Sequence, residues 1–254
     1  MPRLTTLLFD VDGTLAETEE VHREAFNKAF EQAGLDWQWS PSLYAELLAV
    51  TGGKERIGYF LDTWLPDFET PIRLDEYIAS LHAAKTDIYT GMVASGQVAL
   101  RPGVRRLLDE ARGAGLRLGI ATTTTPANVL ALLTHSLADD AQDWFEVIAA
   151  GGVVPNKKPA PDIYFYAMQQ LGVDPRECLA FEDSANGLLS ARDAGLQTLV
   201  TVSQYTRGQD FTGAALVLDQ LGEPDQPFEV LAGDADAYRC VNVQQLRELH
   251  ARFD

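Results

Sequence analysis

The sequence predicts an α/β protein: a parallel β-sheet covered by helices, with a helical domain inserted after the first strand. Short apolar segments alternate with helical patterns from residue 97 onward, as parallel sheets with helices on both faces require. One further apolar strand stands near the amino terminus, and no strong strand signal follows it between residues 16 and 96. We therefore expect a core domain of residues 1–15 and 97–254 and a helical cap domain of residues 16–96.

Composition narrows the class of protein. The 254 residues suffice for a full hydrophobic core, and the net charge of −17 argues against nucleic acid or an anionic membrane as a partner. The two cysteines are too few for a disulfide framework, and Cys178 opens an apolar run, which predicts a core thiol. The chain enters its first strand without a signal peptide and has no membrane-length apolar run, so we expect a cytoplasmic protein, or one of an organelle stroma after loss of a transit peptide.

The first strand is predicted from the apolar residues of segment 4–9, and two carboxylates follow it. Asp10 and Asp12 precede a Gly-Thr turn. An acid at the end of a buried parallel strand points into the crevice where α/β sheets bind ligands. Two such acids repel each other unless a cation or a shared proton relieves them, and Mg²⁺ is the simplest such cation. The alternative is a solvated Asp-Gly turn.

The remaining elements follow from periodicity and from Gly and Pro punctuation. In the cap, helices are expected over 17–34, from Pro41 with Ser40 as N-cap, from the end of the TGGKER segment (51–56) to about 65, and over 74–92. In the core, a helix after Pro102 precedes strands at 116–121, 147–150, 178–181 and 198–202, with helices at 127–137, 162–171 and 184–195 between them. In the tail, segment 216–218 is expected as an edge strand and 243–253 as a helix.

Further polar residues lie where other core strands should end. Thr122 heads a run of four threonines, whose hydroxyls and backbone N–H groups could hold a phosphoryl oxygen or, alternatively, cap the next helix. Lys158 lies in the phrase NKKPAPDIY, and its charge could offset that of a phosphoryl group. Glu182 and Asp183 follow another strand and could complete a metal site with Asp10 and Asp12, or else supply the acidic charge that helix N-termini favour.

These four segments, in this order, resemble the motifs of the haloacid dehalogenase-like (HAD) superfamily. The resemblance implies a Rossmann-like core with a cap and an aspartyl-phosphate mechanism. It makes Asp10 the nucleophile and Asp12 the general acid/base, an acid that the dehalogenases of the superfamily lack, so phosphoryl transfer is favoured. It has Thr122 and Lys158 hold the phosphoryl group. It also implies Mg²⁺ bound by Asp10, Asp183 and the backbone carbonyl of Asp12. Glu182 would contact the metal through a water molecule or support the direct ligands.

The cap position, the phrases DVDGTLAETEE and TGGKER, and the aromatic cluster of Trp37, Trp39 and Tyr44 resemble CbbY-type sugar-bisphosphate phosphatases. This resemblance implies removal of the 1-phosphate of xylulose-1,5-bisphosphate, an inhibitor of Rubisco in the Calvin cycle. A bisphosphate needs a second anion site, and the cap residues Lys54 and Arg56 could supply it.

Other contacts with the substrate are expected beside the motifs. Glu17 and His22 could hydrogen-bond sugar hydroxyls. Alternatively, Glu17 could cap its helix and His22 could be a surface residue. Thr123 is expected to contact the substrate beside Thr122. We expect a monomer whose partner is a small phosphorylated sugar. The alternatives are a β-phosphoglucomutase-like phosphomutase, a phosphoglycolate phosphatase and, more remotely, a non-catalytic phosphate-binding regulator.

Overall fold

The computed structural model describes residues 3–70 and 72–252. Within these residues, seven strands form one sheet in the order β3-β2-β1-β4-β5-β6-β7, and every neighbouring pair is parallel except β6 and β7. The strands are β1 (Thr6–Phe9), β2 (Arg117–Ala121), β3 (Val147–Ala149), β4 (Cys178–Glu182), β5 (Gln197–Thr201), β6 (Leu216–Leu218) and β7 (Val230–Gly233). The α/β fold with a parallel core sheet is therefore confirmed.

Strand β1 lies in the interior of the sheet, next to the middle strand β4. All four of its residues are buried, and it pairs with β2 on one side and with β4 on the other. Because these strands are parallel and in register, the residues that follow β1, β2 and β4 emerge at the same edge of the sheet. The first, second and fourth of the predicted motifs are therefore neighbours in space although they lie far apart in the sequence.

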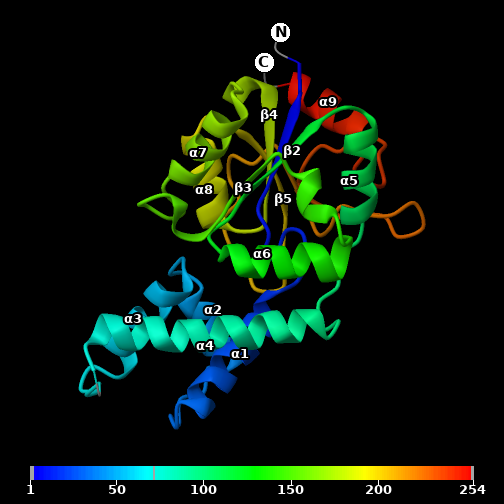
Figure 1. Ribbon diagram of the computed structural model, residues 1–254. Coiled ribbons are helices and arrows are strands. Elements are labelled where there is room, and N and C mark those ends of the chain that lie inside the picture. Colours follow the sequence, from blue (N-terminus) through cyan, green and yellow to red (C-terminus); the bar gives the residue numbers. More distant parts are fainter. Residues whose placement is uncertain (1–2, 71, 253–254) are drawn as a thin grey trace.

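Helices cover both faces of the sheet. Helices α7 (Asp162–Leu171) and α8 (Ala185–Asp193) pack on one face, whereas α5 (Val104–Gly113) and α9 (Val243–Ala251) lie on the other (Figure 1).

Cys178 is buried in this core, and burial raises the pKa of its thiol to about 12, in agreement with a structural role. The described core also contains α6 (Pro126–Leu132), the π-helical turn η1 (Leu133–Leu137) and the 3₁₀ turns η2 (Ala141–Trp144), η3 (Gly151–Val153) and η4 (Pro175–Glu177).

The cap consists of α1 (Glu19–Gln32), α2 (Pro41–Leu47), α3 (Gly53–Trp64) and α4 (Leu74–Ala94), which lie together below the carboxyl edge of the sheet (Figure 1). Ser40 caps α2 through a hydrogen bond from the Leu43 N–H, as expected. The aromatic cluster of Trp37, Trp39 and Tyr44 packs inside the cap with helices α1 and α3. These aromatic rings therefore stabilise the cap. No helix in the described ranges is long and apolar enough to cross a membrane.

Three sequence expectations need correction. Segment 216–218 forms β6, but the edge of the sheet is the antiparallel strand β7, whose exposed residues give no alternating pattern. The helix expected over 127–137 ends at Leu132 and continues as the π-helical turn η1. Helix α3 begins at Gly53, inside the TGGKER segment, so both Lys54 and Arg56 lie in its first turns.

Candidate active site

A cavity of about 610 Å³ separates the carboxyl edge of the sheet from the cap, and both contribute side chains to it. Its core side includes the predicted residues Asp10, Asp12, Thr122, Thr123, Lys158 and Asp183. Its cap side includes Glu19, His22, Lys54, Arg56, His82 and Lys85. The structure therefore brings most of the predicted residues to one site, with basic side chains concentrated there in a strongly acidic protein.

Lys158 is the centre of a buried charge cluster. Its Nζ atom donates hydrogen bonds to Asp10 Oδ1 at 2.7 Å, to Glu182 Oε1 at 2.7 Å and to the Ala121 carbonyl at 2.9 Å. Burial raises the pKa of Asp10 to about 7, although the nearby ammonium group of Lys158 acts in the opposite direction. Lys157, the other lysine of the pair, instead contacts Glu55 of the cap. Of these two lysines, Lys158 is thus the one in contact with the predicted nucleophile.

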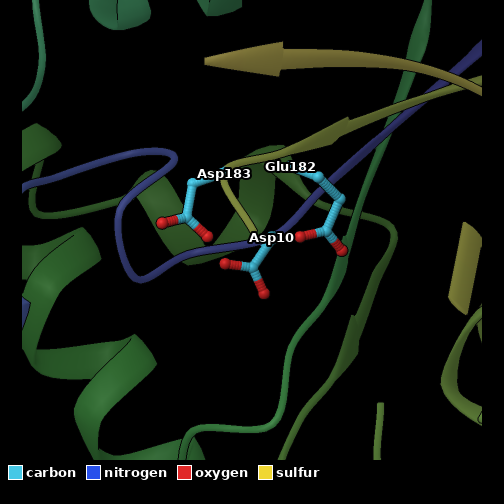
Figure 2. A group of neighbouring side chains, drawn as sticks. All are labelled: Asp10, Glu182 and Asp183. Carbon is cyan, nitrogen blue, oxygen red and sulfur yellow. The ribbon is translucent and has the colours of Figure 1, made fainter. Parts of the chain in front are cut away.

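Three buried carboxylates, Asp10, Glu182 and Asp183, have oxygen atoms within 4.8 Å of one another (Figure 2). Burial first, and then the neighbouring acids Asp10 and Glu182, raise the pKa of Asp183 well above its ordinary value. Glu182 accepts hydrogen bonds at Oε1, but its Oε2 atom is buried without a hydrogen-bond partner in the described structure. Three acids lie together here and Lys158 contacts only two of them, Asp10 and Glu182, so the residues present fit a divalent cation with oxygen ligands. The carboxylate of Asp12 is not part of this group.

The carboxylate of Asp12 faces the cap instead. Its Oδ1 atom accepts hydrogen bonds from Thr18 Oγ1 at 2.6 Å and is 3.0 Å from His22 Nε2. On the other side of the imidazole, Lys85 Nζ lies 2.6 Å from His22 Nδ1. Because an ammonium group only donates, His22 Nδ1 accepts this bond and its Nε2–H is directed at Asp12. Two cap helices therefore orient the predicted general acid/base.

The same contacts determine the charge of this group. Burial alone would raise the pKa of Asp12, but the electrostatic attraction and hydrogen bond of His22 and the hydrogen bond of Thr18 lower it below its ordinary value. Burial lowers the pKa of Lys85 to about 7. Sequence reasoning missed Thr18 and Lys85. The one available signal was a lysine on the apolar face of the long helix that becomes α4.

The four threonines of the run 122–125 differ in their contacts. Thr125 caps α6 through a hydrogen bond from the Asn128 N–H, which is the alternative role that the sequence suggested for these residues. Thr122 is 1% exposed, and its Oγ1 accepts a hydrogen bond from the Thr124 N–H at 3.4 Å. Thr122 and Thr123 line the cavity beside Asp10 and Lys158. Helix capping therefore does not require Thr122, which lines the cavity instead.

The predicted cap residues differ in their surroundings. Lys54 is exposed to the cavity, whereas Arg56 is buried and donates hydrogen bonds to Tyr44 Oη at 3.0 Å and to the Leu47 carbonyl at 3.3 Å. The structure does not bring Glu17 to the cavity. Glu17 lines a separate hollow, where its carboxylate is 3.5 Å from the Arg101 guanidinium. Glu19, two residues later, is the acid that reaches the cavity from this segment.

Polar contacts join the cap to the core around this cavity. Lys157 donates to Glu55 at 2.6 Å, and Asn186 at the start of α8 donates to Thr51 Oγ1 at 3.1 Å. Tyr205, which follows β5, donates through its hydroxyl to Glu20 of α1. All three pairs are partly exposed, so each is worth little by itself. They hold the cap against the core in the conformation that encloses the site.

Known proteins resemble this chain over most of its length. Residues 4–195 match the family model of the haloacid dehalogenase-like hydrolases. Protein CbbY of Rhodobacter capsulatus is 56% identical over 211 residues, which cover 83% of this chain and 91% of that protein. The plasmid CbbY protein of Cupriavidus necator is 45% identical over 247 residues, 97% of either chain.

A solved structure also matches. The D10N mutant of CbbY from Rhodobacter sphaeroides, in complex with xylulose-1,5-bisphosphate, is 48% identical to this chain and superposes with a TM-score of 0.80. The match covers 85% of this chain and 94% of the mutant's chain. The family match, the identity to the CbbY proteins and the shared fold agree with the motifs at the strand ends. The chain therefore belongs to the haloacid dehalogenase-like hydrolases, as a phosphatase of the CbbY type.

Proposed function

We propose that this sugar-phosphate phosphatase removes the 1-phosphate of xylulose-1,5-bisphosphate and so relieves inhibition of Rubisco in the Calvin cycle. The observation that carries the proposal is that the Rhodobacter sphaeroides relative, 48% identical to this chain, binds this bisphosphate. The cavity supports it, because basic side chains lie both at the core edge (Lys158) and on the cap (Lys54). A bisphosphate has an anionic group at each end and suits such a cavity.

In the proposed reaction, an oxygen of Asp10 attacks phosphorus and the bond to the sugar oxygen breaks. Asp12, whose pKa is lowered in the substrate-free protein, must first bind a proton, which it then gives to the departing sugar oxygen. Asp12 then takes a proton from a water molecule whose oxygen attacks the aspartyl-phosphate, which regenerates Asp10 and releases inorganic phosphate. Lys158 and Thr122 hold the phosphoryl oxygens during both steps, as supported by the contact of Lys158 with Asp10.

The metal of this proposal is Mg²⁺. Asp10 and Asp183 would bind it directly, and the backbone carbonyl of Asp12 would be a further ligand. Glu182 would support the site from behind, as its engagement by Lys158 and Tyr164 suggests. When bound, Mg²⁺ offsets the negative charge of the phosphoryl group.

The cap residues complete the proposal. Lys54 and Arg56 would bind the second phosphate. Lys54 would use its exposed ammonium group, and Arg56 the N–H groups that its contacts with Tyr44, Leu47 and Val50 leave unused. Thr123 would contact the transferred phosphate beside Thr122. His22 would act mainly through its hydrogen bond to Asp12. The sugar contact of Glu17 stays a prediction, which would need a different placement of Glu17 when substrate is bound.

We also propose that residues 16–96 act as one cap on the core of residues 1–15 and 97–254. A single chain supplies both sides of the cavity, which supports a monomer as the active unit. We place the enzyme in the cytoplasm, or in an organelle stroma if a transit peptide has been removed. The net charge of −17 supports a small-molecule substrate without nucleic acid or membrane partners.

The test is phosphate release with Mg²⁺ from xylulose-1,5-bisphosphate, ribulose-1,5-bisphosphate, β-glucose-1-phosphate and phosphoglycolate. We expect the highest kcat/KM for the xylulose compound, and no release by the Asp10→Asn protein, which lacks the nucleophile. Preference for phosphoglycolate, or isomerisation of the glucose phosphate without release, would overturn the substrate while leaving the core chemistry intact. Steady-state turnover by Asp10→Asn would overturn the mechanism.

A further inference from the structure

Arg101 is a buried cation that the proposed chemistry does not use. It lies where the chain returns from the cap to the core, next to an antiparallel bridge between Ala16 and Leu100. The backbone N–H of Arg101 donates to the Leu15 carbonyl at 2.9 Å. Its side chain is only 6% exposed, although charged groups at this depth are costly unless their donors are satisfied. The contacts of this guanidinium therefore need an explanation.

Backbone carbonyls from three segments surround the Arg101 guanidinium. Nη1 donates to the Gly13 carbonyl, in the loop after β1, and to the Thr201 carbonyl at 3.0 Å, at the end of β5. Nη2 donates to the carbonyl of Val202 at 2.8 Å and to that of Asp219, which follows β6. The planar, forked guanidinium thus ties together three loops at the carboxyl edge of the sheet, a task for which a lysine lacks the geometry.

Two of these three loops touch the predicted metal ligand Asp183. The backbone of Gly13 packs so closely on this carboxylate that a Cβ atom at Gly13 would lie 2.1 Å from Asp183 Oδ2. On the other loop, Ser203 directly follows Val202, and its side chain is near enough to the Asp183 carboxylate to lower the pKa of that group. Arg101 holds the carbonyls of Gly13 and Val202, so it fixes both walls of the space that Asp183 occupies.

Arg101 does not belong to the substrate-binding surface. It is absent from the lining of the 610 Å³ cavity and lines a separate hollow beside Glu17 instead. Its Nη1 and Nη2 donors are directed at carbonyl oxygens and its Nε faces the Glu17 carboxylate, so it is poorly placed to bind a phosphate in the cavity. Any effect of Arg101 on the reaction must therefore act through the residues that it holds.

We propose that Arg101 is a positioning residue, which holds the Gly13 and Val202 loops so that Asp183 is preorganised as a ligand for a divalent cation. The inference rests on the proposed Mg²⁺ site. It predicts that the shape of the guanidinium, beyond its charge, sets metal affinity. Loss of a group that orients a metal ligand without touching the metal typically lowers metal affinity by about 10–100-fold.

The test is Mn²⁺ binding, measured by electron paramagnetic resonance on substrate-free protein, for wild type, Arg101→Lys and Arg101→Gln. Arg101→Lys keeps the positive charge but loses the fork, and we expect its Mn²⁺ dissociation constant to rise about 10-fold or more. The Mg²⁺ concentration for half-maximal phosphate release should rise by a similar factor. Arg101→Gln should weaken Mn²⁺ binding at least as much.

Arg106 provides the matched control. Its guanidinium also ties backbone carbonyls, those of Gly222 and Val241, but it lines neither the cavity nor the hollow beside Glu17. Arg106→Lys should lower the thermal midpoint without changing Mn²⁺ affinity. Unchanged Mn²⁺ affinity in Arg101→Lys, or equal weakening in Arg106→Lys, would overturn the inference. Absence of Mn²⁺ binding in wild type would instead overturn the proposed metal site on which the inference rests.

Discussion

The two sides of the cavity are built differently. On the core side, charged groups are buried and held by one another, as Lys158 is by Asp10 and Glu182. On the cap side, His22 and Lys85 form one buried chain to Asp12. However, Lys54 and Glu55 are exposed, and the other contacts to the core are isolated pairs such as Lys157 with Glu55. A buried network has one geometry because each unsatisfied member is costly, whereas exposed pairs are easily broken. The core side is therefore suited to fixed chemistry and the cap side to opening and to choosing the substrate.

Adjacent lysines offer the strongest test of this difference. Lys158→Met removes the cation that Asp10 and Glu182 share, and we expect kcat to fall by at least about 100-fold, because the charge that offsets the phosphoryl group is lost. Lys157→Met removes only a partly exposed pair and should change kcat by less than about fivefold. Steady-state phosphate release by both variants measures the contrast. Similar losses in the two proteins would show that the two lysines are not divided between core and cap as their contacts indicate.

The core side could be largely predicted from the sequence because it depends on local rules. Asp10, Thr122 and Asp183 each follow a strand, and parallel strands deliver such residues to one edge. The choice of Lys158 over Lys157 came instead from the resemblance of its phrase to a HAD motif, and the structure brings Lys158 to Asp10. Strand ends and motif resemblance together thus carry most of the information about this side.

The rest could not be predicted, because it depends on how helices pack. Lys85 reaches His22 from a helix that is 63 residues away in sequence, and Arg101 reaches carbonyls up to 118 residues away. The hydrophobic periodicity of a sequence carries no information about such long-range contacts. Strand β7 was missed for another reason, since an exposed edge strand of four residues has no buried face to give an alternating pattern.

The second test concerns substrate choice on the cap side. Lys54→Ala should raise KM for xylulose-1,5-bisphosphate by about 10–100-fold, the usual worth of a hydrogen bond between charged groups, because the second phosphate loses a cation. Hydrolysis of a simple aryl phosphate, which has no second phosphate, should change by less than about twofold. Lys28→Ala is the matched control, since Lys28 is exposed on the cap but does not line the cavity. Equal losses on both substrates would remove Lys54 from the second-phosphate site.

The smallest effect that we expect is a pH dependence of stability on the cap side, at His82. Burial, followed by the charges of Lys85, Lys54 and Lys157, lowers the pKa of His82 to about 4, while Glu55 opposes this change. Between pH 6.5 and about 4, the unfolded chain therefore binds a proton at this site and the folded protein does not. The contribution of neutral His82 to stability is complete above pH 6.5 and is lost as the pH falls toward 4.

His82→Gln removes this titration, so it should lose less stability than wild type when the pH is lowered. The difference should reach about 2 kcal/mol at pH 5, or roughly 4–8 °C in thermal midpoint. Thermal unfolding at pH 8 and pH 5 measures it, with His135→Gln as control because His135 is exposed in the core domain. If the His82→Gln and His135→Gln proteins show the same change between the two pH values, His82 is not held neutral, and the cap side is more open to water than its contacts indicate.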